Sequence, residues 1–229
     1  MKKLLFILLI NYTLFANSLP SSISTTVTSV STNSVQVDAT IPKGTSGIVI
    51  HNYGNNLSAI THILVSTGGK QATIHPYKGL GHEKLPNIKS DVIKGDKVIF
   101  GNFYENILII APNEEVYRKT KQGIKKSFIH PDIYAMDLII HGEKEISLAN
   151  LKAFAQRNQV GLVLIAIKDY IMVLDPISSE YLHKFPLTLK VDHAVSPFYA
   201  RFEQISNGIF GTESNQKFLD YYEGVNQIK

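Results

Sequence analysis

Cysteine is absent from this sequence of 229 residues. The chain therefore has no disulfide framework, no lipidated cysteine and no cysteine nucleophile, so its stability must come from a packed core. Catalytic signatures are missing too, including a Gly-x-Ser-x-Gly elbow and a Gly-Lys-Ser/Thr phosphate loop. One Ser-x-x-Lys match, Ser214 to Lys217, lacks its companion motifs, and we interpret it as polar surface. We expect a protein that is not an enzyme and holds no cofactor.

Long blocks of one charge sign are also lacking. The formal net charge of the chain is +4, and it falls to +2 without Lys2 and Lys3 at the start of the sequence. No stripe of lysine and arginine alternates with aromatic residues, as a phosphate backbone would require. The sequence therefore argues against nucleic-acid binding.

No apolar run is long enough to span a bilayer comfortably. The chain does begin with Lys2 and Lys3, followed by an apolar stretch that ends at Ala16. This order is typical of a signal peptide, so we predict that residues 1–16 are removed after Ala16, although an uncleaved anchor is the alternative. This start of the sequence predicts that the protein is exported.

Histidine is the main candidate for metal binding, because four of the residues lie in the amino-terminal half: His51, His62, His75 and His82. A zinc site needs three or four converging ligands, and two of them are usually close in sequence. No close pair occurs here, so we expect surface or half-buried histidines and no metal site. The acidic pairs Glu114–Glu115 and Glu143–Glu145 lie in polar surroundings, which indicates solvated surface rather than acid–base catalysis.

Turn residues and short alternating runs predict a strand-rich α+β protein with two units. After a Ser/Thr-rich lead-in at 17–34, which we interpret as extended chain or an edge strand, residues 35–118 predict a small β-barrel or sandwich. Residues 127–229 predict an α+β unit with one main helix. The basic stretch at 118–126 is either a linker or the solvated end of a helix.

Local signals place several elements within these units. Residues 103–111 contain an apolar run that predicts a strand buried on both faces, and Asn113 is a good cap for a short helix after it. Residues 134–140 are predicted to form a strand. Ser147 is expected to cap a helix that runs to about Asn158.

Two further patterns lie toward the carboxyl end. Residues 160–167 and 170–174 predict a hairpin around Lys168–Asp169. Aromatic residues gather at 196–202 and 218–222, where they form either a binding surface or, as we favour, core.

A family resemblance rests on three stretches of the sequence. Residues 95–100 read Gly-Asp-Lys-Val-Ile-Phe, and residues 108–117 read Leu-Ile-Ile-Ala-Pro-Asn-Glu-Glu-Val-Tyr. Together with Ser-Pro-Phe-Tyr-Ala-Arg at 196–201, they resemble the amino-terminal domain family of the plasminogen-binding proteins of epsilon-proteobacteria. The resemblance covers most of the chain after the signal and implies an exported, noncatalytic protein of the cell envelope. Its expected location is the cell surface, with outer-membrane association left open, or the periplasm.

The resemblance also implies a partner and a candidate ligand-binding residue, Lys229. Kringle modules of plasminogen recognise a terminal lysine, because one site receives both its ammonium group and its free carboxylate. The last residue of this sequence is Lys229. We therefore expect a protein partner, with host plasminogen bound through Lys229. The alternatives are a structural or assembly component of the envelope with a bacterial partner, and a hydrolase with an unrecognised site.

Overall fold

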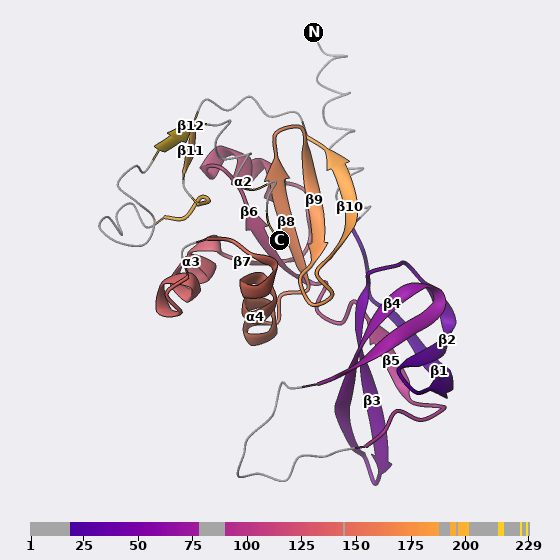
Figure 1. Cartoon of the computed structure of the whole chain (residues 1–229). Coiled ribbons are helices and arrows are strands. Elements are labelled where there is room, and N and C mark those ends of the chain that lie inside the picture. Colours follow the sequence, from indigo (N-terminus) through magenta and orange to yellow (C-terminus); the bar gives the residue numbers. More distant parts are fainter. Residues whose placement is uncertain are drawn as a thin grey trace.

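The computed structural model describes residues 19–77, 90–143, 145–187, 193–195, 197–201, 215–217, 225 and 228. The predicted signal peptide at 1–16 lies outside these ranges. Within them, no helix combines the length and the apolar character that crossing a bilayer would demand. Two strand-rich units lie side by side (Figure 1), as the sequence predicts.

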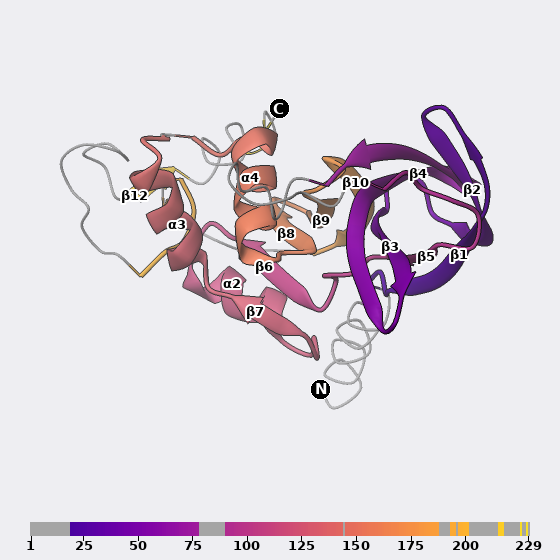
Figure 2. The same ribbon diagram turned by 90° about the horizontal axis from the view of Figure 1, so that it is seen from below.

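The amino-terminal unit is a closed five-stranded barrel with the order β1-β2-β4-β3-β5. All of its pairs are antiparallel, and β5 closes the ring by pairing with both β1 and β3. Figure 2 looks into this ring. The strands are β1 (Ile23–Ser31), β2 (Ser34–Ile41), β3 (Ser46–Gly54), β4 (Leu57–Pro76) and β5 (Lys97–Phe100).

Strand β4 pairs with two neighbouring strands because it bends. Its first part pairs with β3, and its part after the bend pairs with β2. The bend lies at Gly68 and Gly69, whose φ angles of 104° and 68° are readily adopted only by glycine. The barrel then encloses an apolar core, formed by Val27, Val35, Val37, Ile41, Val49, Leu64, Ala72, Val92, Val98 and Phe100.

The second unit is a mixed sheet with the order β10-β9-β8-β6-β7. Strand β6 runs parallel to both β7 and β8, whereas β9 and β10 are antiparallel additions. Helix α2 covers one face of the sheet, and α3 and α4 cover the other. The elements are β6 (Asn106–Ile110), α2 (Glu114–Lys121), β7 (Ser127–Ile129), α3 (Pro131–Ile140), α4 (Leu148–Asn158), β8 (Leu162–Ile167), β9 (Tyr170–Asp175) and β10 (Glu180–Pro186). A small two-stranded sheet adds β11 (His193–Val195) and β12 (Asn215–Lys217).

Several local predictions are confirmed. Strand β6 is buried on both faces, because Ile107 and Ile109 pack under α2 while Leu108 and Ile110 pack under α3 and α4. The side chain of Asn113 caps α2 by accepting from the Val116 N–H.

The predicted α4 and the hairpin are confirmed as well. Ser147 and Asn150 form a reciprocal capping box at the start of α4. Strands β8 and β9 form the hairpin around Lys168–Asp169. The basic stretch at 118–126 begins as the end of α2, where basic side chains favour the helix dipole.

The strand predicted at 134–140 is wrong, because these residues lie in α3. Pro131 occupies the first turn of this helix and His130 caps it. The helix carries apolar residues on its exposed side as well as its buried side, so the sequence shows no helical period. Without that period, a short apolar run reads equally well as a buried strand.

The unit boundaries differ from the predicted ranges. Strand β1 lies within the lead-in expected at 17–34, yet it is a full member of the barrel. Strand β6 and helix α2 lie within the β-rich unit expected at 35–118, yet they belong to the second sheet. The chain passes from barrel to sheet between β5 and β6, at residues 101–105.

Candidate functional site

A buried carboxylate joins the two units. Asp175, the last residue of β9, is fully buried, and its Oδ2 accepts from the backbone N–H of Ser46 at 2.8 Å and from the Tyr104 hydroxyl at 2.6 Å. Its Oδ1 accepts from the N–H groups of Ile177 and Ser178 at 2.9 and 3.1 Å. Because Ser46 belongs to the barrel, these bonds fix its position against the sheet. We call this group of five residues the Asp175 junction.

The phenol of Tyr104 is held as a hydrogen-bond donor. Burial, and next the nearby charge of Asp175, raise the pKa of Tyr104 well above its ordinary value. The hydroxyl therefore stays protonated and donates a hydrogen bond to the carboxylate. The junction is a structural connection, because each oxygen of the Asp175 carboxylate already accepts two hydrogen bonds from the protein itself.

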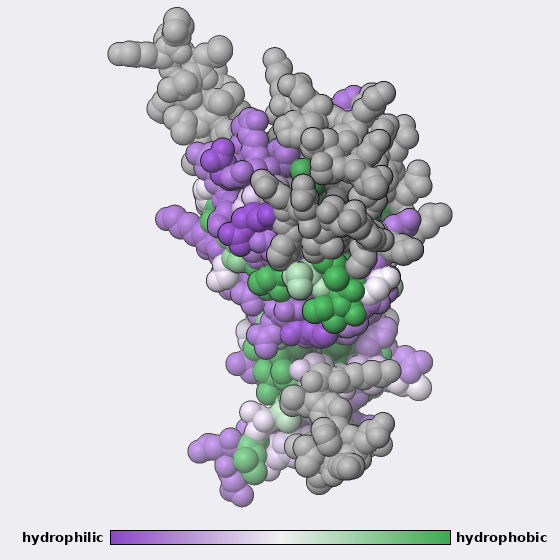
Figure 3. Space-filling model, turned by 90° about the vertical axis from the view of Figure 1, so that its left-hand side faces the viewer, coloured by the Kyte–Doolittle hydropathy of each residue, from purple (hydrophilic) through white to green (hydrophobic). Residues whose placement is uncertain are grey.

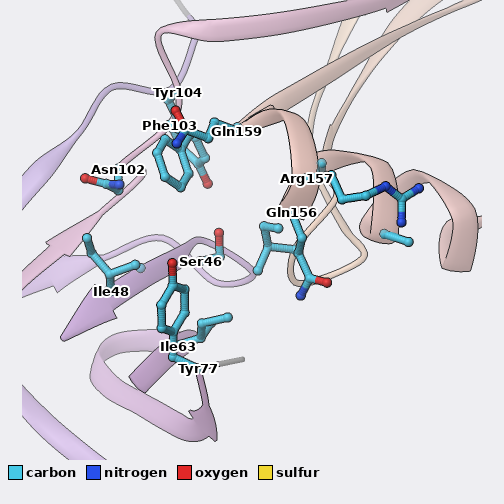
Figure 4. Close-up of a pocket in the computed structure, with 15 residues that line it drawn as sticks. Ser46, Ile48, Ile63, Tyr77, Asn102, Phe103, Tyr104, Gln156, Arg157 and Gln159 are labelled. Atoms are coloured by element: carbon cyan, nitrogen blue, oxygen red, sulfur yellow. The ribbon is translucent and has the colours of Figure 1, made fainter. Parts of the chain in front are cut away.

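A cavity of about 480 Å³ opens beside the junction, between the barrel and α4 (Figure 4). We call it the inter-unit cavity. Its barrel wall is β3 and β4, and its other wall is α4 with the 101–105 connection. It is lined by Ser46, Gly47, Ile48, Ile63, Tyr77, Asn102, Phe103, Tyr104, Ala153, Ala155, Gln156, Arg157, Gln159, Gly161 and Ile177.

The lining of the inter-unit cavity mixes apolar and polar side chains and carries no unpaired charge. It includes no aspartate or glutamate. Its one cation, Arg157, is paired with Asp137, which accepts from Nη2 at 2.6 Å and from Nε at 3.3 Å. In Figure 4 the Arg157 side chain extends away from Tyr77 and Phe103. The cavity therefore favours a neutral ligand.

The carboxyl ends of the parallel strands are the usual ligand site of an open α/β sheet. Here β7 and β8 flank β6, so its carboxyl end is such a switch point. The chain itself fills the place, because the N–H groups of Val195 and Tyr199 donate to the carbonyls of Pro112 and Ala111, both at 2.7 Å. A ligand at this edge would have to displace the chain's own segment.

An ion pair holds the same segment. Asp132 at the start of α3 accepts from the backbone N–H and from Nε of Arg201, both at 2.7 Å. Burial alone would raise the pKa of Asp132, but these two hydrogen bonds outweigh it and lower the pKa below its ordinary value. Burial lowers the pKa of neighbouring His130, which packs against the rings of Tyr117 and Tyr199. These groups hold the described part of the segment against the sheet.

Of the four histidines considered for metal binding, the three that the structure describes do not form a metal site. Nδ1 of His51 lies 2.8 Å from a carboxylate oxygen of Asp96, and His75 bonds the Thr73 hydroxyl at 3.0 Å. Burial lowers the pKa of His62. His82 lies outside the described residues. Across the described ranges, no three histidine, aspartate or glutamate side chains gather where they could hold a metal ion.

The remaining sequence candidates are placed only in part. Lys229 and Ser214 lie outside the described residues, as do Phe202 and the aromatic residues of 218–222. Phe198 is buried and stacks on Tyr134, so for this residue the core interpretation is confirmed. Among the acidic pairs, Glu114 and Glu115 form exposed ion pairs within α2.

Neither the Asp175 junction nor the inter-unit cavity was predicted from the sequence. Asp175 ends an apolar strand just before Pro176, and an acid in that place reads as an ordinary turn residue. Two of its partners, Ser46 and Tyr104, are 129 and 71 residues away in the sequence. Only the three-dimensional arrangement brings them together.

Helix α3 exposes apolar side chains on its outer side. Ile133, Met136 and Ile140 follow a helical spacing, and Ile140 is 72% exposed. Figure 3 views the molecule from the side on which α3 lies in Figure 1, and apolar patches interrupt the polar surface there. A helix that is apolar on all sides is typical of a covered position.

Comparisons with known proteins point to one family. The family model described as "Plasminogen-binding protein pgbA N-terminal" matches residues 22–226. Two relatives, both named "Plasminogen-binding protein PgbA" and found in Helicobacter pylori strains 26695 and J99, are 28% identical over 176 residues. The alignments cover 73% of this chain but 38% of each relative, so the chain spans well under half of their length. No solved structure matches.

Proposed function

This chain belongs to the family of the plasminogen-binding protein PgbA amino-terminal domain, and we propose that it is an exported, noncatalytic protein of the cell envelope that binds plasminogen. The match over residues 22–226 carries the proposal, because the relatives that share this region are named for plasminogen binding. The exposed apolar side of α3 adds support, since such patches are typical of protein-binding surfaces. The basic and apolar start of the sequence supports export.

The proposed point of contact is Lys229. A carboxyl-terminal lysine combines an ammonium group with a free carboxylate, and a kringle site can bind both at once. Its aliphatic stem can lie along aromatic rings. The mechanism requires Lys229 to be the last residue of the processed protein and to project into solvent.

The decisive experiment measures plasminogen capture by the protein lacking residues 1–16, using biolayer interferometry. Deletion of Lys229 should weaken capture about tenfold or more, as expected for the loss of a dominant contact. The lysine analogue 6-aminohexanoate should compete with the intact protein. Lys152→Ala, which removes an exposed lysine from α4, is the matched control and should leave capture unchanged.

Two outcomes would contradict the terminal-lysine mechanism. Unchanged capture after deletion of Lys229, with no competition by the analogue, would remove it. A parallel variant, Ile140→Asp, changes the exposed side of α3 without altering any terminal group. If only Ile140→Asp loses plasminogen capture, the binding surface is the exposed side of α3 and not Lys229.

Location separates a host partner from a bacterial one. If the protein has an envelope assembly role instead, crosslinking in envelope fractions should recover a bacterial partner reproducibly. Protease added to intact cells should digest the protein if it lies on the surface. Full protection would confine it to the periplasm and would defeat plasminogen as its partner.

A further inference from the structure

The inter-unit cavity has side chains with unused hydrogen-bonding capacity. Tyr77, Asn102, Gln156 and Gln159 all line it, and within the described ranges none of their side chains bonds another residue. Figure 4 shows them on different sides of the space, with Tyr77 on the barrel side and Gln156 on α4. Three amides and a phenol can donate and accept at the same site. A ligand rich in hydroxyl or amide groups would satisfy them.

The same cavity offers apolar surface between these polar groups. Ile48 and Ile63 are paired neighbours on β3 and β4, and Ile177 approaches from the turn after β9. The ring of Phe103 lies across from that of Tyr77 (Figure 4). A purely apolar ligand would leave the amides without partners, whereas a fully polar ligand would gain nothing from the rings. The lining therefore suits a molecule that has hydroxyl groups to bond the amides and apolar C–H surfaces to pack on the rings.

Charge and backbone geometry narrow the ligand class further. The one cation of the lining, Arg157, is neutralised by Asp137, and the lining has no carboxylate. The cavity wall at Ser46 to Ile48 belongs to β3, whose two edges are already paired with β4 and β5. An extended peptide cannot add a strand to an edge that is occupied. These features disfavour charged ligands and peptides bound by strand addition.

We propose that the inter-unit cavity is a binding site for a neutral saccharide unit. Sugar hydroxyls pair with the free amides, and the faces of a sugar ring pack on Phe103 and Tyr77. The volume of about 480 Å³ falls within the range of small-molecule sites. The Asp175 junction holds the two walls at a fixed separation, so the site is formed before the ligand arrives. This inference is independent of plasminogen binding and of Lys229.

Isothermal titration calorimetry tests the proposal with defined probes. The protein lacking residues 1–16 is titrated with tetra-N-acetylchitotetraose, with maltotetraose and with tetra-alanine. At least one tetrasaccharide should bind saturably with a dissociation constant near or below about 1 mM. Preference for tetra-N-acetylchitotetraose would identify N-acetylated sugars as the ligand class, and preference for maltotetraose would identify plain hexoses. Tetra-alanine should not bind.

Matched variants locate the site. Gln156→Leu removes one free amide from an exposed position of α4 and preserves helix propensity, so the fold should be unaffected. It should weaken saccharide binding about tenfold, and Asn102→Ala should weaken it similarly. Gln36→Leu makes the same chemical change on the outer surface of β2 and should have no effect. A thermal melt confirms folding of each variant.

The proposal is overturned by any of three results. No saturable saccharide binding up to about 10 mM would exclude the site, since even a weak ligand of 1 mM affinity would nearly saturate it. Binding that Gln156→Leu and Asn102→Ala leave intact would place the sugar elsewhere. Binding of tetra-alanine that depends on the same two residues would show that the cavity receives a peptide.

Discussion

Substitution of Asp175 by asparagine should destabilise the contact between barrel and sheet. The carboxylate uses both oxygens, and each accepts two hydrogen bonds. Asparagine keeps one oxygen and replaces the other with an NH₂ group, which donates. Turned one way, the NH₂ group faces the N–H donors of Ile177 and Ser178; turned the other way, it faces the Ser46 N–H and forces the Tyr104 hydroxyl to accept, so two bonds to a charged oxygen are lost in either case.

The magnitude follows from these lost bonds. A hydrogen bond to a charged group contributes about 1.5–3 kcal/mol, so two of them amount to about 3–6 kcal/mol. Part of this loss is recovered because a neutral amide costs less to bury than a carboxylate. We expect Asp175→Asn to lower the free energy of unfolding by about 4 kcal/mol. Asp169→Asn, at an exposed position of the β8–β9 turn, is the control and should change it by less than about 0.5 kcal/mol.

Urea denaturation followed by circular dichroism measures the loss. Tyr104→Phe removes one donor of the four and should cost about 1–2 kcal/mol by itself. In a double-mutant cycle, the two substitutions should be coupled, because they break the same bond. A loss below about 1 kcal/mol for Asp175→Asn would refute the reasoning, since it would mean that water satisfies the donors at no cost.

Three further predictions concern other parts of the structure. The free energy of unfolding should fall as pH rises above about 10, because the pKa of Tyr104 is higher in the folded than in the unfolded protein, so the unfolded chain loses its phenol proton first. Urea titrations at several pH values measure this loss. The free energy of unfolding should depend less on pH in Tyr104→Phe. Asp132→Asn should free the segment around Arg201, so trypsin should cleave after Arg201 faster than in the parent protein, whereas Asp38→Asn should leave the rate unchanged. Gly161→Ala should cost about 1–3 kcal/mol in urea denaturation, because the added methyl would overlap the Phe103 carbonyl.

Contrary results would be equally informative for these three. An unchanged alkaline profile in Tyr104→Phe would mean that other groups control stability above pH 10. Equal trypsin cleavage of the Asp132 variant would show that the backbone bonds of the segment suffice to hold it. A neutral Gly161→Ala would show that the 101–105 connection can shift without cost.

The sequence predicted those elements whose signals are local. The apolar run of β6, the Ser147 cap of α4 and the turn at Lys168–Asp169 each act within a few residues, so the pattern and the structure agree. Helix α3 was missed because its outward side is as apolar as its buried side. The periodic signal on which helix prediction depends was therefore absent there.

Long-range pairing explains the other differences. Strand β1 has a Ser/Thr-rich sequence that reads as exposed chain, yet β5 pairs with it from more than 65 residues away and closes the barrel. The Asp175 junction depends on partners that are equally remote. Short strands and frequent turns predicted a small barrel or sandwich, but the pairing of β1 with β5 and the cavity beside the junction cannot be predicted from a window of neighbouring residues.

The two proposals rest on different parts of the chain and can fail separately. The inter-unit cavity is built from residues 46–177, all within the region that the family model matches. The terminal-lysine mechanism depends on the final residue, which lies just beyond that region. Deletion of Lys229 leaves every cavity residue in place, and Gln156→Leu leaves the terminus in place. If deletion of Lys229 abolishes plasminogen capture but leaves saccharide binding intact, the protein has two separate binding functions, one at Lys229 and one in the inter-unit cavity.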